Sequence, residues 1–460
     1  MTTVAATSVD PFAPEALGAH ARELLERDRW PRERLLGLQR ERLRSLLRHA
    51  VERSPYYREA LGPGAENAGL ADLPTLPKRV LMELFDQIVT DRRLRLTDLE
   101  AFLAEADAGA AYLGEYRVFS TAGTTGVPGV FVYTREELAR WIAVSFAALA
   151  RVGVTAETRF VAIGAPSALH ITRQMFAAMQ SGRGDVPRLT VLTPMADIVE
   201  ALNRYRPQAL LGYASVVAML ADEQLEGRLS IEPRVAICTS EVLTDDAARR
   251  IEEAWAIQPC NAYASTEAPP TATGSLDHVG MHIWESELVL EVVDDHGHHV
   301  PPGVPGSKVL LTNLVNRAQP LIRYELSDSV VIEPGPDPSG RPYLRIARVD
   351  GRSDDILRLP AVTGGEVAVH PFRLRAPFVR LHDVRQYQVV HRADRLLVRI
   401  VVRDGSPRDL PERVRTSIAS ALADAGAAFP VGVEVVAGLE REQDHAGKLK
   451  LVVSEVAPAA

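Results

Sequence analysis

Residues 120–129 read Ser120-Thr121-Ala122-Gly123-Thr124-Thr125-Gly126-Val127-Pro128-Gly129, between an apolar-aromatic stretch and the apolar run 130–134. The three glycines allow the backbone to turn its N–H groups toward an anion, and the four hydroxyls supply further donors. The GxxxxGK[ST] spacing of a Walker loop is absent. On its own, the segment therefore predicts either a phosphate-binding loop or a plain hairpin.

Strand-like and helical segments alternate on the C-terminal side of this loop. Residues 159–163, 189–192 and 235–238 form short apolar runs that predict buried strands, whereas 135–150 and 245–255 have the spacing of helices. Strands that alternate with helices are typical of an α/β domain with a layered core. We predict such a domain here.

The pattern changes toward the C-terminus. Two further runs, 288–293 and 308–314, are separated by turn-forming residues and predict a β-rich appendage. Beyond the charged junction 348–355 the expected elements are strands at 387–392, 396–402 and 431–436 and a helix at 410–425. We predict a large N-terminal α/β domain over residues 1–352, with 1–25 poorly ordered. A hinge joins it to a small, mobile α+β domain over 353–460.

Composition narrows the class of partner. The 460 residues include 52 Lys and Arg against 60 Asp and Glu, so the formal net charge is −8. That balance argues against nucleic acid and anionic membranes as partners. Two cysteines, Cys238 and Cys260, are too few for a disulfide framework, and no apolar run approaches the length of a membrane span. We expect a cytoplasmic protein, as a monomer or a homodimer.

Residues 30–61 combine leucines at helical spacing with a series of arginines. We predict one amphipathic helix whose basic face is solvated and has no functional role. The arginines of that face are Arg32, Arg34, Arg40, Arg42, Arg44 and Arg48.

Four further motifs follow the Gly/Thr loop in a fixed order. They are Asn261-Ala262-Tyr263-Ala264-Ser265-Thr266-Glu267, Leu321-Ile322-Arg323-Tyr324-Glu325-Leu326-Ser327-Asp328, Gly351-Arg352-Ser353-Asp354-Asp355 and Gly447-Lys448-Leu449-Lys450. Together the five segments resemble the core motifs of adenylate-forming enzymes, the superfamily of acyl-CoA synthetases, nonribosomal adenylation domains and luciferases. The sequence is most similar to the phenylacetate–CoA ligase branch. That similarity also rests on residues 54–58, 73–78, 282–285 and 320–324 and covers most of the chain beyond about residue 30.

The resemblance implies roles for residues at matching positions. Glu267 would ligate Mg²⁺, and Lys448 would be catalytic, stabilising negative charge as a carboxylate attacks the α-phosphate of ATP. Tyr263 would stack on adenine, Asn261 would bind its exocyclic amine, and Asp328 would accept both ribose hydroxyls. The other implied ATP-binding residues are Thr121, Gly123, Thr124, Thr125, Gly126, Ser240, Glu241, Ser265, Thr266 and Arg352. Asp354 matches the position of the hinge.

The resemblance also places an acid-binding pocket between the Gly/Thr loop and Tyr263. Small residues there leave room for a flat aromatic acid. The predicted pocket residues are Gly164, Ala165, His170, Tyr213, Ala214, Ala262 and Ala264. His170 fits equally well as a pocket residue or as a hydrogen-bonded core histidine.

Three positions depart from the family pattern. Val127 stands where the loop usually carries lysine, Glu325 lies where an arginine is usual, and residues 359–365 replace an Arg-Gly-x-Asn stretch. The sequence predicts an enzyme that uses ATP and Mg²⁺ to adenylate an aromatic carboxylic acid and then transfers the acyl group to CoA. Two alternatives stay open: transfer to an amine or a carrier-protein thiol, and a non-catalytic homologue that binds nucleotide or acid.

Overall fold

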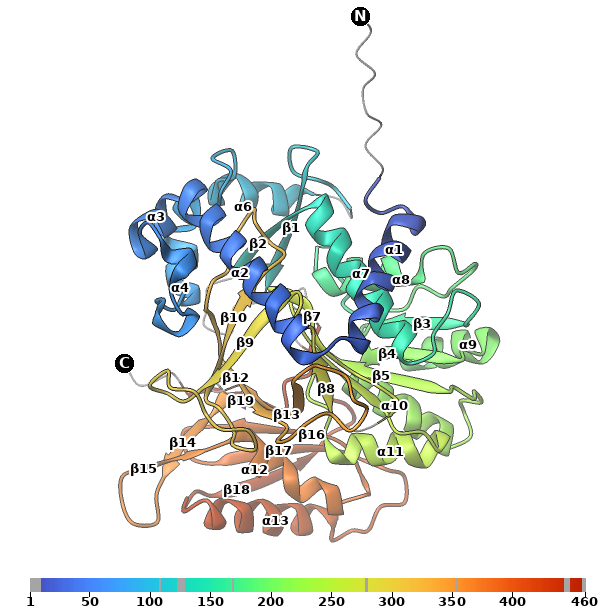
Figure 1. Ribbon diagram of the computed structural model, residues 1–460. Coiled ribbons are helices and arrows are strands. Elements are labelled where there is room, and N and C mark those ends of the chain that lie inside the picture. The colour runs from blue at the N-terminus through green and yellow to red at the C-terminus, as the bar shows by residue number, and fades with distance from the viewer. Residues whose placement is uncertain are drawn as a thin grey trace, which may run out of the picture.

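The computed structural model describes residues 10–106, 109–121, 129–167, 169–277, 280–352, 355–441 and 447–456 (Figure 1). Its centre is an eight-stranded mixed sheet with the strand order β12-β13-β8-β7-β6-β5-β4-β3. Strands β3 to β6 run parallel to one another, and the remaining pairs are antiparallel. The strands are β3 (Phe160–Ile163), β4 (Ala209–Tyr213), β5 (Val235–Thr239), β6 (Cys260–Ser265), β7 (Ala268–Gly274), β8 (Met281–Ile283), β12 (Asp328–Ile332) and β13 (Arg345–Arg352).

Helices cover both faces of the parallel part of this sheet. Leu211 and Ile237 belong to the main core with α7 (Arg135–Arg151) and α8 (Ile171–Gln180). On the other face, Leu210 and Ala236 pack with α9 (Met195–Tyr205), α10 (Ala214–Leu225) and α11 (Asp245–Trp255). This layered arrangement confirms the predicted α/β class.

Local signals explain where the helices begin and end. Thr134 and Glu137 form a reciprocal capping box at the start of α7, and Thr244 accepts a hydrogen bond from Ala247 N at the start of α11. These helices and the strands β3 and β5 confirm the corresponding predictions. The predicted strand at 189–192 is wrong. Thr190 makes only an isolated bridge with Gly164, and a hydrogen bond from Thr193 N to Thr190 O turns the chain away from the sheet.

Two smaller sheets extend the large unit. One pairs β1 (Tyr116–Thr121) with β2 (Gly129–Thr134), the two strands that flank the Gly/Thr loop. The other has the order β11-β10-β9, with β9 (Leu288–Val293), β10 (Lys308–Asn313) and β11 (Tyr324–Leu326), and forms the predicted β-rich appendage. The helices α4 (Lys78–Glu83), α5 (Phe85–Ile88) and α6 (Leu96–Glu105) lie near these sheets (Figure 1).

The N-terminal region differs from the prediction in two respects. Residues Pro14–Glu26 form helix α1, which buries Leu17, Ala21 and Leu24 and packs against α7, so the expected disorder of residues 14–25 is wrong. The single helix predicted over 30–61 is two helices, α2 (Arg32–Arg53) and α3 (Pro55–Leu61). Ser54 adopts an extended backbone before Pro55 and caps α3 through its side chain, which interrupts the helix.

The basic face of α2 is not simply solvated, which is a second correction. Arg32 pairs with Glu285, and Arg42 Nη1 lies 2.7 Å from Glu287 Oε1. Glu287 is fully buried and also pairs with Arg27 and Arg140. The three arginines at Glu287 hold its pKa below the ordinary value, although burial acts in the opposite direction.

The C-terminal unit has a hydrophobic core of its own. Its four-stranded sheet has the order β18-β17-β16-β19, and Val398, Ile400 and Ile418 are buried between that sheet and α13. The elements are β14 (Leu357–Pro360), β15 (Glu366–Val369), α12 (Pro371–Arg375), β16 (Val384–His391), β17 (Leu396–Val402), α13 (Leu410–Asp424), β18 (Val431–Val435) and β19 (Val452–Ser454). Of these, β16, β17, α13 and β18 confirm the predicted strands and helix. The boundary at 352/353 stays a prediction, since Ser353 and Asp354 lie outside the described residues.

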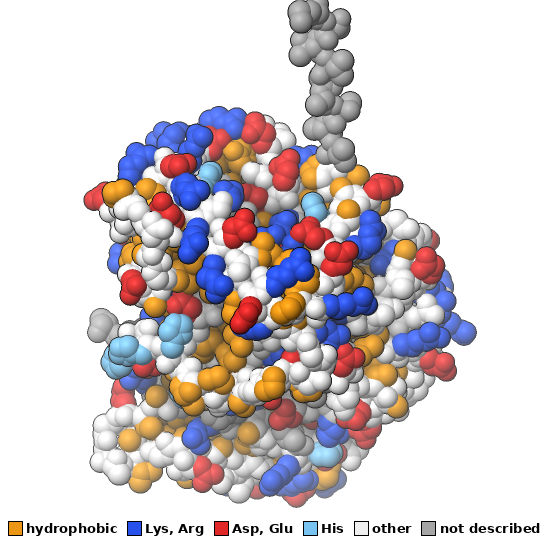
Figure 2. Space-filling model, in the orientation of Figure 1, with side chains coloured by type: hydrophobic (Ala, Val, Ile, Leu, Met, Phe, Trp, Pro, Cys, Tyr) orange, Lys and Arg blue, Asp and Glu red, His pale blue; other side chains and the backbone are white. Residues whose placement is uncertain are grey.

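The surface charge and the helix lengths complete the description. On the face seen in Figure 2, basic and acidic side chains are interspersed. No helix in the part of the chain that the structure describes is both long enough and apolar enough to cross a bilayer.

Candidate active site

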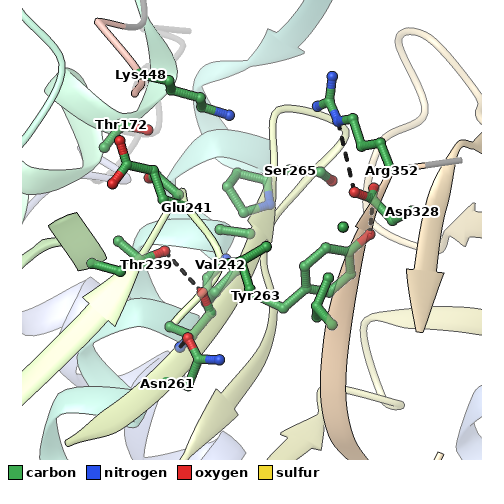
Figure 3. A pocket seen from close by; sticks show the side chains of 18 of the residues that line it. Thr172, Thr239, Glu241, Val242, Asn261, Tyr263, Ser265, Asp328, Arg352 and Lys448 are labelled. Atoms are coloured by element: carbon green, nitrogen blue, oxygen red, sulfur yellow. Dashed lines mark hydrogen bonds and ion pairs between the residues drawn. The ribbon is translucent and has the colours of Figure 1, made fainter. Parts of the chain in front are cut away.

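A cavity of about 720 Å³ opens between the large unit and the segment around Lys448 (Figure 3). It is lined by loops that follow the parallel strands, by the β6–β7 hairpin and by the start of β12. Most of the predicted site residues line it: Thr121, His170, Ala214, Ser240, Glu241, Asn261, Ala262, Tyr263, Ala264, Ser265, Thr266, Glu267, Asp328, Arg352 and Lys448. The structure therefore brings residues of all five sequence motifs to one cavity, the Gly/Thr loop through Thr121, since residues 122–128 lie outside the described part of the chain.

Strand β6 divides the cavity because its side chains alternate between two faces. Its residue Cys260 is the register partner of Ile237, so Cys260 and Ala262 face the layer formed by α7 and α8. Asn261 and Tyr263 point to the opposite face. One strand can therefore serve an apolar compartment and a polar compartment at the same time.

Tyr263, Asp328 and Arg352 form a polar group on the second face. The Tyr263 hydroxyl donates to Asp328 Oδ2 over 2.9 Å, and Arg352 Nε lies 3.8 Å from Asp328 Oδ1 (Figure 3). Burial raises the pKa of Tyr263, and the charge of Asp328 raises it further, so the phenol stays protonated. Each carboxylate oxygen of Asp328 has two lone pairs, so it retains acceptor capacity for the hydroxyls of a ligand.

Glu267 lies in the tight turn between β6 and β7. Two residues that the sequence analysis missed hold this turn: Tyr133 donates to Thr266 O over 2.6 Å, and Asn313 Nδ2 donates to Glu267 O over 2.6 Å. The Glu267 side chain is only 7% exposed. Burial raises the pKa of Tyr324, and the charge of Glu267 raises it further. Burial raises the pKa of Glu267, and the nearby charges of Lys78 and Arg352 partly oppose that effect.

These surroundings fit a cation that is shared with a ligand. Glu267 supplies hard carboxylate oxygens of the kind that Mg²⁺ prefers. Among the described residues, no group of three or more His, Cys, Asp or Glu side chains is placed to form a protein-only metal site. A Mg²⁺ ion at Glu267 would need phosphate oxygens to complete its coordination.

Lys448 enters the cavity from the C-terminal unit, and its side chain extends toward the space between Glu241 and Arg352 (Figure 3). The neighbouring Leu449 donates its backbone N–H to Glu241 Oε1 over 2.8 Å. Glu241, which we predicted to bind ATP, thus uses its carboxylate for contacts within the protein.

Comparison with known proteins identifies the family. The model of the AMP-binding enzyme family matches residues 117–312. Phenylacetate-coenzyme A ligase of Thermus thermophilus is 27% identical over 79% of this chain and 80% of its own length. The Escherichia coli K12 phenylacetate-coenzyme A ligase is 26% identical over 81% and 84% of the two chains. These matches support the adenylate-forming superfamily and, within it, the phenylacetate–CoA ligase-like branch.

Solved structures of another adenylate-forming protein share this fold. 2-Hydroxyisobutyryl-CoA ligase is 21% identical to our chain, and its structure in the postadenylation state has a TM-score of 0.72, covering 93% and 91% of the two chains. The same ligase in its thioesterification state gives a TM-score of 0.56 with the same coverage. The two units of our adenylate-forming chain are therefore arranged more like the postadenylation structure.

Some of the predicted site residues lie outside this cavity. Gly164, Ala165 and Tyr213 are not part of the cavity lining, which corrects three of the pocket assignments. Tyr213 is fully buried in a separate core cluster that includes Val161. Gly164 packs against the Phe176 ring, which separates it from the cavity. The predicted Gly123, Thr124, Thr125, Gly126 and Asp354 lie outside the described residues.

His170 combines the two interpretations that the sequence left open. It lines the cavity, and its Nδ1 also accepts a hydrogen bond from Thr172 N over 3.2 Å at the start of α8.

The departure from the family pattern at Glu325 also has an explanation. Its carboxylate accepts from the Thr75 hydroxyl over 2.6 Å and lies 3.2 Å from Lys308 Nζ.

The sequence analysis missed the apolar part of the cavity. Side chains from α7 and α8 cover the face of the sheet that carries Ala262 and form an apolar sleeve, which consists of Leu149, Val152, Met175, Phe176 and Met179. Thr273 of β7 faces the same space because it is the register partner of Ala262. Pairing across strands joins residues far apart in the sequence, so no local pattern marked these positions.

Proposed function

We propose that the protein activates a carboxylic acid with ATP, forming an acyl-adenylate and pyrophosphate, and then transfers the acyl group to CoA. The observation that carries this proposal is the single cavity in which an apolar sleeve meets Lys448, Glu267 and the Tyr263–Asp328–Arg352 group. Its curated relatives include proteins named phenylacetate-coenzyme A ligase, which supports the same reaction class.

In the first half-reaction a carboxylate oxygen of the acid attacks the α-phosphorus of ATP, and the bond from that phosphorus to the bridging oxygen breaks. Pyrophosphate leaves with the electron pair. Lys448 donates hydrogen bonds to the oxygens on which negative charge builds up, and its charge is most effective in a site that excludes water. A Mg²⁺ ion bound beside Glu267 would neutralise phosphate charge.

The polar compartment positions the nucleotide. Tyr263 presents its ring to adenine, and Asp328 accepts hydrogen bonds from the ribose hydroxyls while Arg352 balances its charge. Held in this way, the α-phosphate lies near Lys448, and the reacting groups need little further ordering. In the second half-reaction the sulfur of CoA attacks the acyl carbon, and AMP leaves.

The apolar compartment selects the acid. The sleeve formed by α7 and α8 offers Phe176 and flexible methionines, while Ala262 and Ala214 leave space beside the sheet. A flat aromatic ring fits between such surfaces, so we assign an aromatic carboxylic acid as substrate. CoA is the proposed acceptor, and an amine or a carrier-protein thiol is the competing outcome.

The test is product analysis by mass spectrometry. Purified protein with Mg·ATP, CoA and a panel of aromatic and aliphatic acids should yield AMP and the acyl-CoA of an aromatic acid. Lys448→Ala should lower adenylation at least about 100-fold, whereas the matched Lys450→Ala change should cost much less. Adenylate without thioester would move the acceptor to an amine or a carrier thiol. No acid-dependent AMP with any acid would refute the proposal in favour of a binding protein.

A further inference from the structure

Glu241 joins the two units of the protein through one carboxylate. Its Oε2 accepts a hydrogen bond from Ser215 N at the start of α10 over 3.0 Å. Its Oε1 accepts two bonds from the C-terminal unit, from Leu449 N over 2.8 Å and from Arg441 Nη1 over 3.2 Å. The side chain is 9% exposed, so these contacts form largely away from water.

Arg441 completes this contact from the other side. Its Nη2 donates to the Ser215 hydroxyl over 2.7 Å, and its Nη1 also lies 3.3 Å from Gly447 O. Arg441 and Leu449 therefore hold the chain on both sides of Lys448 against the same carboxylate. We call the group Ser215, Glu241 and Arg441 the clasp.

A second set of ion pairs lies along α10. Asp222 is fully buried and pairs with Arg403 of the C-terminal unit and with Arg250 of α11. Beside it, Glu223 lies 3.0 Å from Arg385 Nη2. In both sets the large unit contributes carboxylates and the C-terminal unit contributes arginines, so the charges of the two surfaces are complementary.

The clasp differs from the second set in its position. In the described part of the chain, Arg403 and Arg385 join the units through Asp222 and Glu223, whereas Arg441 bonds directly to the residue before Lys448. Loss of Arg441 should thus loosen the contact between the units beside Lys448 and affect the placement of the lysine ammonium, although the second set still keeps the units in contact.

We propose that Arg441 is a positioning residue for Lys448: by binding Glu241 and Ser215 it fixes the lysine in the cavity for the adenylation half-reaction. This inference rests on the proposed function. A residue that only positions Lys448 for attack on ATP has no role once the acyl-adenylate has formed. Its removal should slow adenylation selectively.

The test compares the two half-reactions in Arg441→Gln. Acid-dependent exchange of labelled pyrophosphate into ATP reports adenylation, and a single turnover of synthetic acyl-adenylate with CoA reports acyl transfer. We expect exchange to fall about 10-fold, the effect of losing a hydrogen-bonded charge pair, while transfer stays within about twofold of the unaltered protein. Arg399→Gln is the matched control, because among the described residues Arg399 forms its ion pair within the C-terminal unit, with Glu434.

The outcomes separate this inference from the proposed function. Equal losses in both half-reactions, or no loss in either, would overturn the role of Arg441. If no acid supports pyrophosphate exchange in the unaltered protein, the proposed function fails instead. A distance measurement then still tests the clasp. Spin labels on cysteines introduced at the exposed Arg204 and Arg415 should give a broader interunit distance distribution in Arg441→Gln. An unchanged distribution would overturn the inference.

Discussion

Glu267→Gln should impair catalysis and stabilise the protein at the same time. The carboxylate is buried in the β6–β7 turn, and glutamine keeps the same side-chain length and one acceptor oxygen. The substitution therefore removes the charge with little change of shape. Without that charge we expect adenylation to fall about 100- to 1,000-fold, as on loss of one preorganised charge-stabilising group.

The stability gain depends on pH with a defined sign. Burial raises the pKa of Glu267, so the folded protein binds this proton more tightly than the unfolded chain does. The stability that Glu267 contributes is fully present below its unfolded pKa and is lost as the pH rises through the raised folded pKa. Glutamine does not ionise, so the variant does not lose stability in this way as the pH rises. The variant should hence be more stable by about 1–3 kcal/mol at pH 8, with the difference disappearing at low pH.

Tryptophan fluorescence during urea unfolding measures this difference in metal-free protein. All four tryptophans lie before residue 285, so the signal reports the large unit. Other carboxyl groups titrate alike in both proteins and cancel in the comparison. Glu200→Gln, at a position 71% exposed on α9, is the matched control and should be nearly neutral. Destabilisation by Glu267→Gln at pH 8, or retained adenylation activity, would refute the reasoning.

Two further substitutions test the packing around the site. Glu287→Gln should lower the free energy of unfolding by roughly 3–5 kcal/mol, because it leaves the buried Arg27 facing Arg42 and Arg140 with the half-exposed Glu23 as its remaining ion-pair partner among the described residues. Urea titration measures this change in the free energy of unfolding, and a loss below about 1 kcal/mol would contradict the ion pairs assigned to Glu287. Thr273→Val should raise stability by about 1 kcal/mol, since the hydroxyl is buried without a hydrogen-bond partner among the described residues. A lower thermal midpoint would show that this hydroxyl is satisfied.

The parts of the fold that the sequence predicted are those with local signals. The helix expected at 245–255 matches α11 because Thr244 caps its start and Ala256 ends it in a left-handed conformation. The motif around Glu267 was predicted through its resemblance to a family, and the structure places it at the cavity. Here local chemistry and tertiary structure agree.

The parts that were missed depend on partners far away in the chain. Arg42 looks like a solvated helix residue, but its partner Glu287 lies about 245 residues later. Thr273 reaches the cavity only because its register places it opposite Ala262. Glu241 was assigned to ATP through the family resemblance, yet Arg441 of the C-terminal unit binds its carboxylate. Spacing along a sequence does not encode such pairings.

Acid-dependent exchange of labelled pyrophosphate into ATP, measured in the protein and in Lys448→Ala, tests the central claim most directly. It isolates adenylation and needs no assumption about the acyl acceptor. The account predicts exchange that requires both Mg²⁺ and an aromatic acid and that falls at least about 100-fold in the variant. Exchange that is absent with every acid, or that persists without Lys448, would contradict it.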